Sequence, residues 1–232
     1  MKAKRFVEID AARGALVLLM LAYNWSFALA FFSLLPFDLK PWYWLSGFVS
    51  AWFFLAGLSA WLALQRKPET DVFKHGVLVF LAGAGITAVT LVSFPGYAVW
   101  FGVLHLIGVS VMLAPFFVRL KKWNAVIGLA VIAAGFLVKN SLFDSNAFLF
   151  LGMRAAPLQA FDYTPLLPWF GFFLIGMAYA SVFYAKTKTK QETFIGEKNA
   201  LCVLGRHSLL VYLVHQPLFV GLLWLFGLIK LF

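Results

Sequence analysis

Apolar runs long enough to cross a bilayer constrain this chain more than any other feature. A helix needs roughly 20 mostly apolar residues to cross about 30 Å of hydrocarbon. Of the 232 residues, 63% are hydrophobic and 12% are charged, whereas soluble domains average about 45–50% and about 25%. The sequence therefore predicts an all-α, polytopic membrane helix bundle, a single domain over residues 1–232 in a lipid bilayer. Its transmembrane helices number about seven and are expected near residues 11–35, 42–64, 75–94, 98–118, 124–143, 166–185 and 207–229.

Lysine and arginine residues are distributed unevenly between the two sides of this bundle. With the N-terminus in the cytoplasm, all 19 lie in cytoplasmic segments except Lys40, Lys139, Arg154 and Lys230. The positive-inside rule then predicts a cytoplasmic N-terminus and, with an odd number of spans, a C-terminus outside. The net charge of +10 is assigned to anionic lipid headgroups rather than to nucleic acid, because it is concentrated in these loops.

The first apolar run is interpreted as a retained helix. Basic residues precede it, as in a signal peptide, but Glu8 and Asp10 interrupt the basic region and apolar character continues past Ala30. Glycines at 47, 83, 85, 128 and 135 are expected to permit close helix packing.

Several polar groups lie inside these apolar runs, where they are costly and usually line a site or a pathway. Asp10, Arg13 and Asn24 fall on one stripe of the first span. At a rise of 1.5 Å per residue, Asn24 lies roughly 20 Å from the inner surface and His105 about 10 Å below the outer surface, so their depths match. His215 lies roughly 12 Å from the inner face, on a stripe with Ser208 and Tyr212.

A structural interpretation stays open for each of these groups. Asp10 and Arg13 form an interfacial pair in that interpretation, and His215 hydrogen-bonds between helices. Asp162 and Tyr163 precede a proline-marked helix start and would cap that helix. No metal is expected, since the chain has 1 cysteine, Cys202, and no H-E-x-x-H motif.

Four segments, read in order, resemble a known family. They are Phe6-Val-Glu8-Ile-Asp10-Ala-Ala-Arg13-Gly14, Phe101-Gly102-Val-Leu-His105-Leu-Ile-Gly108, Asp162-Tyr163-Thr-Pro165-Leu-Leu-Pro168-Trp169-Phe-Gly171 and Leu204-Gly205-Arg206-His207-Ser208-Leu-Leu-Val-Tyr212-Leu-Val-His215-Gln216-Pro217. Together they resemble the DUF1624 group of bacterial membrane proteins. That group is similar to the catalytic domain of heparan-alpha-glucosaminide N-acetyltransferase and, more distantly, to the acyltransferase-3 membrane acyltransferases.

The resemblance implies acyl transfer across a bacterial or archaeal cytoplasmic (inner) membrane. Acetyl-CoA or another acyl-CoA is the expected co-substrate, on the cytoplasmic side, and a sugar amine or hydroxyl of a glycan or glycolipid on the outer face accepts the acyl group. Relatives often carry a histidine near Asn24 and an aspartate near Ala28, so the expected base shifts to His105 or His215.

Site roles follow from this expectation. Catalysis is assigned to His105 as the preferred base, Asn24 as an oxyanion donor and His215. Binding of the CoA moiety is assigned to Asp10, Arg13, Arg206, His207 and Ser208, and acceptor binding to Asp162, Tyr163, Tyr212 and Gln216.

Alternatives to this mechanism and to this class of protein remain open. Transfer is either direct or proceeds through an acyl-histidine. A non-enzymatic carrier or flippase would also use a polar trail through the membrane, and a degenerate relative would bind CoA without turnover. The acceptor, the acyl length and the presence of homo-oligomers stay open.

Overall fold

The computed structural model describes residues 6–35, 47–138, 143, 145–156, 158–185 and 199–229, and these residues form helices and connections without a β-strand. Two compact units divide the chain. The first contains residues up to Trp52 and from Lys188 onward, and the second contains Phe53–Thr187. The single domain expected from sequence stays a prediction, and the expected connections at 36–41 and 186–198 lie outside the described residues.

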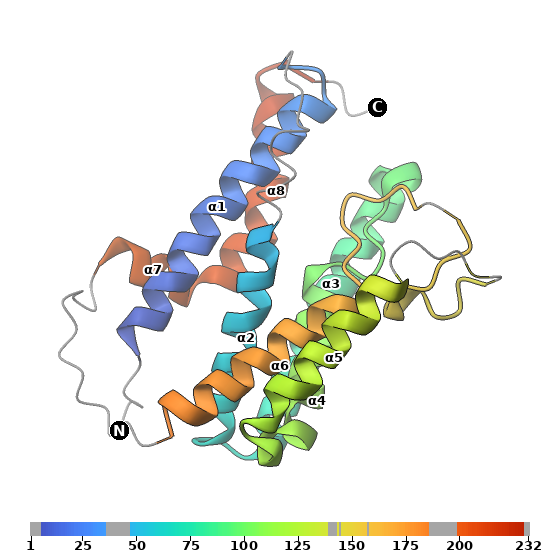
Figure 1. Cartoon of the computed structure of the whole chain (residues 1–232). Coiled ribbons are helices and arrows are strands. Elements are labelled where there is room, and N and C mark those ends of the chain that lie inside the picture. Colours follow the sequence, from blue (N-terminus) through green and yellow to red (C-terminus); the bar gives the residue numbers. More distant parts are fainter. Residues whose placement is uncertain are drawn as a thin grey trace. The chain divides into compact units, whose positions relative to one another are not determined.

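The first unit is built around helix α1 (Val7–Phe31), with α7 (Ala200–Arg206) and α8 (Ser208–Leu225) packed against it (Figure 1). Two glycines make the α1–α7 contact possible. A Cβ atom on Gly14 would collide with the backbone oxygen of Leu201, and one on Gly205 with the backbone oxygen of Asp10. Close backbone approach through small residues is the usual way to join helices in lipid, where hydrophobic burial gives no driving force between them.

Two antiparallel helix pairs form most of the second unit. Helix α3 (Glu69–Ser93) pairs with α4 (Val103–Phe117), and α5 (Trp123–Val138) pairs with α6 (Leu166–Phe183) (Figure 1). Helix α2 (Phe48–Leu64), whose first turn belongs to the first unit, packs on α6 where Gly57 meets the Phe173 backbone and Gly176 meets the Phe54 backbone. The short 3-10 helices are η2 (Pro95–Tyr97), η3 (Val118–Leu120) and η4 (Leu149–Leu151).

Glycine packing was predicted correctly at some positions only. A Cβ on Gly83 would approach the His105 ring, one on Gly128 the backbone of Gly171, and one on Gly135 the ring of Pro168. Nothing lies within 4 Å of a Cβ built on Gly47 or Gly85. Sequence spacing identifies a smooth helix face, but the partner helix decides which face is used.

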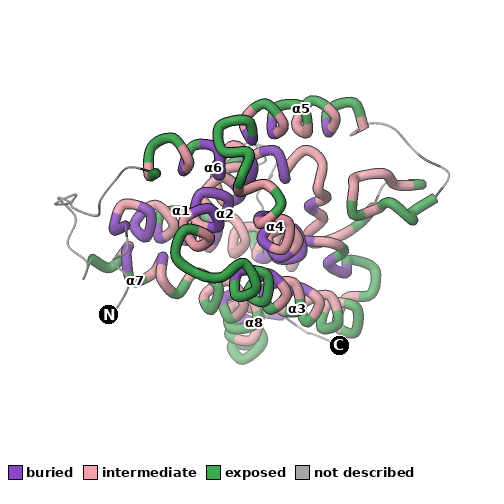
Figure 2. The backbone as a smooth tube through the Cα atoms, turned by 90° about the horizontal axis from the view of Figure 1, so that it is seen from below, coloured by how far each residue is buried: buried purple, intermediate pink, exposed green. Residues whose placement is uncertain are grey.

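Five helices are long and apolar enough to cross a membrane, namely Val7–Phe31, Glu69–Ser93, Val103–Leu120, Leu166–Phe183 and Ser208–Leu225. The apolar helices α2 and α5 are shorter, with 17 and 16 residues. Large apolar side chains such as Val92, Phe116 and Leu137 are 76–83% exposed, and exposed positions are frequent along α5 (Figure 2). Such surfaces are unsuited to water, so the chain is an integral membrane protein.

Three of the differences from the expected spans have a local physical reason. Helix α3 begins at Glu69, six residues before position 75, because Glu69 and Asp71 favour a helix N-terminus. Helix α4 begins at Val103 rather than near 98, since Val99 bonds through its backbone to Thr87 and Thr90 instead. Helix α7 was not predicted; its N-cap is Asn199, whose side chain accepts a hydrogen bond from the Leu201 amide.

Candidate functional site

A buried carboxylate joins two arginines where α1 and α7 cross. Asp10 accepts from Arg13 Nη1 at 3.5 Å through one oxygen and from Arg206 Nε at 3.2 Å through the other. The Asp10 side chain is 6% exposed, and each arginine side chain is 27% exposed. We call these three residues the arginine–aspartate cluster. Two cations and one anion leave it with a net positive charge, and its guanidinium groups remain within reach of a ligand.

The chain turns from α7 into α8 beside this cluster. His207 separates the two helices and is exposed, with its Nδ1 at 2.9 Å from the backbone oxygen of Val203. Ser208 is the first residue of α8. The five residues assigned to CoA binding therefore form one connected set. Three of them are consecutive, at positions 206–208, and Asp10 bonds both Arg206 and Arg13.

Backbone acceptors fix the hydrogen of the His215 ring. His215 is buried, and its Nδ1 lies 2.8 Å from the carbonyl oxygen of Tyr212 and 3.2 Å from that of Val211. A carbonyl can only accept, so Nδ1 carries the proton and Nε2 of the neutral ring is a bare acceptor. This is the tautomer that a general base requires at Nε2. The Tyr212 ring lies edge-on to His215, with centroids 5.7 Å apart.

A stacked ring pair sets the register of α1 against α8. Trp25 stacks on Phe219 with centroids 4.9 Å apart and planes 9° apart. Asn24 precedes Trp25 by one residue, and His215 precedes Phe219 by four. For two helices that run side by side in the same direction, Asn24 and His215 thus differ by only about 5 Å in position along the helix axes.

Two buried polar atoms without a described hydrogen-bond partner belong to residues next to Asn24 and His215 in the chain. Trp25 Nε1 and Gln216 Oε1 are buried and have no hydrogen-bond partner among the described residues. Buried polar atoms of this kind normally have a protein or solvent partner. A donor and an acceptor without a described partner therefore lie one residue along the chain from Asn24 and from His215. Trp25 was not among the residues singled out from the sequence.

His105, in the second unit, has the opposite tautomer. It is the third residue of α4, and its Nδ1 accepts a hydrogen bond of 3.2 Å from the amide of Gly102. Since that nitrogen accepts, the proton of the neutral ring lies on Nε2. Nε2 is 3.5 Å from the Thr87 hydroxyl, which itself donates to the Val99 carbonyl at 2.7 Å. His105 is therefore a donor at Nε2.

The surroundings of His105 hold its ring on several sides. Phe80 meets it edge-on at 5.2 Å and Phe101 stacks on it at 5.8 Å between centroids. Phe101 has a φ of 26°, an unfavourable value for a residue with a side chain. The two threonines on α3, Thr87 and Thr90, were missed from sequence, although their spacing of three places them on one helix face.

Asp162 caps a helix, but not the one that follows it. Its Oδ2 accepts from the Val103 amide at 2.8 Å, at the start of α4, and its Oδ1 accepts from the Thr164 hydroxyl at 2.6 Å. The expected capping of the helix after Asp162 is thus replaced by capping of α4. The first amides of an α-helix have no acceptor within the helix, and the Asp162 carboxylate supplies one for the Val103 amide.

Tyr163 lies in the same connection and links it to the segment around Leu149. Its hydroxyl donates to the Leu149 carbonyl at 2.7 Å. Burial raises the pKa of the Tyr163 phenol, and the Arg154 cation opposes this with a smaller effect. The phenol is accordingly neutral near pH 7 and acts as a donor.

The predicted site residues fall into two groups. Asp10, Arg13, Asn24, Arg206, His207, Ser208, Tyr212, His215 and Gln216 belong to the first unit, and His105, Asp162 and Tyr163 to the second. The predicted match in depth between Asn24 and His105 stays a prediction, because those residues belong to different units. The described residues hold no group of three or more His, Cys, Asp or Glu side chains suited to a metal ion.

Fold and polar groups together define a class: an integral membrane protein that keeps histidine, amide and ion-pair groups within or beside apolar helices. Comparison with known families is more specific. The family model described as heparan-alpha-glucosaminide N-acetyltransferase, catalytic, matches residues 5–217, and the chain belongs to this family. Neither a curated protein nor a solved structure matches the chain.

Proposed function

We propose that this protein is a membrane acetyltransferase that moves an acyl group from cytoplasmic acyl-CoA to a sugar amine or hydroxyl on the outer face. The observation that carries the proposal is the family match, which extends over residues 5–217 and so includes every candidate site residue. The protein crosses a bacterial or archaeal cytoplasmic membrane seven times in this proposal, with α2 and α5 as additional spans.

Acyl-CoA is a substrate here, and the arginine–aspartate cluster is suited to its phosphates. Guanidinium groups form charge-assisted hydrogen bonds with phosphate in a fixed fork geometry. Asp10 holds Arg13 and Arg206 in place from their buried side. His207 is exposed beside them, and Ser208 with the first amides of α8 adds donors at a helix N-terminus, where anions are favoured.

His215 is the proposed general base, in place of His105, which was the base predicted from the sequence. Its bare Nε2 takes the proton of the acceptor amine or hydroxyl as that N or O attacks the thioester carbon. Asn24, within about one helical turn of the same level, donates to the developing oxyanion through its amide. The C–N or C–O bond forms, the C–S bond breaks, and the proton passes to the CoA thiolate.

His105 is proposed to act differently, as a hydrogen-bond donor to a substrate oxygen through Nε2. The Gly102 amide occupies its other nitrogen, which makes it a poor base in this arrangement. The residues proposed to bind the substrate that accepts the acyl group are unchanged: Asp162, Tyr163, Tyr212 and Gln216.

The test combines binding with turnover. Purified protein in detergent is unfolded thermally with acetyl-CoA, CoA or ATP, since a ligand of the folded state raises the midpoint. Labelled acetyl-CoA is then offered with a panel of amino sugars and glycolipids. Selective stabilisation and acceptor-dependent consumption support the enzyme. Stabilisation without consumption indicates a CoA-binding relative, and substrate movement without chemical change indicates a carrier.

Direct transfer and a covalent acyl-His215 intermediate are separated by kinetics. A covalent route releases CoA before the acceptor binds and gives ping-pong behaviour. Direct transfer requires both substrates together, so no CoA burst appears when the acceptor is omitted.

A further inference from the structure

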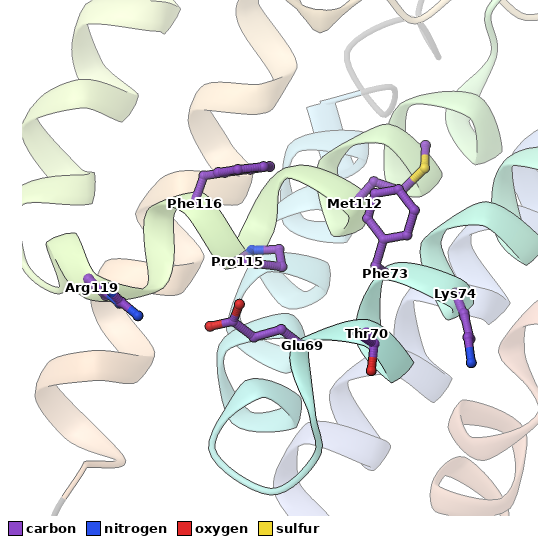
Figure 3. A pocket seen from close by; sticks show the side chains of 8 residues that line it. All are labelled: Glu69, Thr70, Phe73, Lys74, Met112, Pro115, Phe116 and Arg119. Atoms are coloured by element: carbon purple, nitrogen blue, oxygen red, sulfur yellow. The ribbon is translucent and has the colours of Figure 1, made fainter.

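A groove lies in the second unit, where α3 begins and α4 ends. Its volume is about 590 Å³, within the usual range of about 300–1,000 Å³ for small-molecule sites. The lining side chains that matter here are Phe73, Lys74, Met112, Pro115, Phe116 and Arg119. Figure 3 shows Lys74 and Arg119 toward opposite ends of the groove, with the apolar side chains between them.

The wall of this groove is apolar and accessible. Phe73 is 45% exposed and Phe116 is 76% exposed, and Met112 and Pro115 complete the surface. Both helices are long and apolar enough to cross a membrane. The groove is therefore at one end of two spans, where acyl chains and headgroups meet.

Two cations of the groove lack an acidic partner within the described part of the chain. Lys74 and Arg119 are exposed, and neither forms an ion pair with any described residue. Glu69 also lines the groove, but it belongs to the first turn of α3, where a carboxylate stabilises the helix N-terminus. The adjoining connections add four more basic residues, so this end of the helix pair is strongly basic. They are Arg66, Lys67, Lys121 and Lys122.

We propose that this groove binds one anionic phospholipid, with its phosphate at Arg119 and an acyl chain along Phe73 and Phe116, while Lys74 at the other end of the groove adds positive charge that favours an anionic over a zwitterionic lipid. Basic pockets between membrane helices recognise anionic headgroups in this way. A free phosphate or a nucleotide would use the cations but would leave the apolar wall uncovered. Lipid binding in this groove does not depend on catalysis and extends beyond the proposed function.

The experiment compares lipid-dependent stability in nanodiscs made from phosphatidylcholine alone or with phosphatidylglycerol. Wild type is compared with the double variant Lys74→Gln/Arg119→Gln and with Lys121→Gln/Lys122→Gln, which removes the same charge from the same end. We expect phosphatidylglycerol to raise the unfolding midpoint of wild type and of the control variant Lys121→Gln/Lys122→Gln by similar amounts. The groove variant Lys74→Gln/Arg119→Gln should lose at least half of that rise.

Two further measurements keep the outcome decisive. Native mass spectrometry counts the phosphatidylglycerol molecules that stay bound, with one expected on wild type and none on the single variant Arg119→Gln. This single variant replaces the double variant if the double variant does not fold. Added inorganic phosphate or CoA should not displace it. Equal responses of the two charge-neutralised pairs, no preference for the anionic lipid, or displacement by inorganic phosphate or CoA would each overturn the proposal.

Discussion

At the scale of single residues, backbone groups decide what each histidine can do. His105 accepts from an amide at Nδ1, whereas His215 donates from Nδ1 to carbonyl oxygens. The two rings therefore differ at Nε2, which carries a hydrogen in His105 and a bare lone pair in His215. The same residue type in two apolar helices is thus suited to donate in one helix and to act as a base in the other.

Glutamine substitutions test this division, because glutamine offers an N–H donor but no base. We expect His215→Gln to lower the turnover number at least about 100-fold, the usual scale of general-base catalysis, with the acetyl-CoA dissociation constant little changed. His105→Gln should stay within about tenfold, since losing a donor altogether costs about 10²–10³. The exposed Lys121→Gln is the control, and a reversed order of effects would assign the base to His105.

The arginine–aspartate cluster gives a second prediction at this scale. Asp10→Asn leaves two guanidinium groups side by side without their carboxylate. Breaking a fully buried pair costs about 3–5 kcal/mol, and the partial exposure of both arginines reduces this to about 2 kcal/mol. The measurement is denaturant unfolding in detergent, with the exposed Asp71→Asn as control. Equal stability of the two variants would contradict the role given to Asp10.

At the scale of helices, close contacts depend on glycine. Gly205 lets the backbone of α7 reach that of α1 beside Asp10, and this contact also sets the position of Arg206. Sequence spacing alone did not identify α7 as a helix. Its seven residues are too few to be stable in isolation, so packing against α1 must stabilise it.

Replacement of glycine by alanine separates contact from helix propensity. Gly205→Ala should destabilise the protein by about 2 kcal/mol or more, the usual scale of overpacking, because its Cβ meets backbone that cannot move aside. Gly85→Ala meets nothing within 4 Å and should gain about 0.5–1 kcal/mol from helix propensity. Thermal midpoints measure both, and a loss of stability in both variants would refute the distinction.

The capping of α4 by Asp162 gives a further prediction for a helix. Asp162→Ala removes the acceptor for the Val103 amide and should cost about 1 kcal/mol, a shift of roughly 2–4 °C in the midpoint. Asp162→Asn keeps one acceptor and should cost less. If Asp162→Asn instead raises the Michaelis constant for the acceptor without changing stability, its main role is substrate binding.

At the scale of the whole molecule, the distribution of charge predicts the orientation in the membrane. The basic residues that precede α1, precede α3 and follow α4, together with residues 186–206, belong to one side under the positive-inside rule. Seven crossings then place the C-terminus on the opposite side from residues 186–198.

Reporter fusions test this arrangement directly. Alkaline phosphatase fused after Phe232 should be active, and green fluorescent protein inserted within 186–198 should fluoresce, because each reporter works on only one side of the membrane. Green fluorescent protein fused after Lys67, in the basic connection before α3, should fluoresce as well. Cytoplasmic behaviour of the C-terminal fusion would refute the odd number of spans.

Much of the fold is encoded locally. Apolar runs of membrane length predict helices because each backbone group must be bonded within its own segment in lipid, and most helices appear where the runs lie. The polar residues within those runs are equally visible in the sequence, since their cost in hydrocarbon sets them apart. Asp10, Asn24, His105 and His215 could therefore be selected without a structure.

Tertiary structure alone decided what those residues contact. Asp10 and Arg206 are 196 positions apart in the chain, and Asp162 and Val103 are 59 apart. Their meetings depend on helix packing and on a connection folding back, which no local pattern records. The sequence by itself determined most of the helices, the membrane environment and the candidate polar groups. The structure determined the partners, and with them which histidine nitrogen carries the proton, because a hydrogen atom follows the donor or acceptor that packing places beside it.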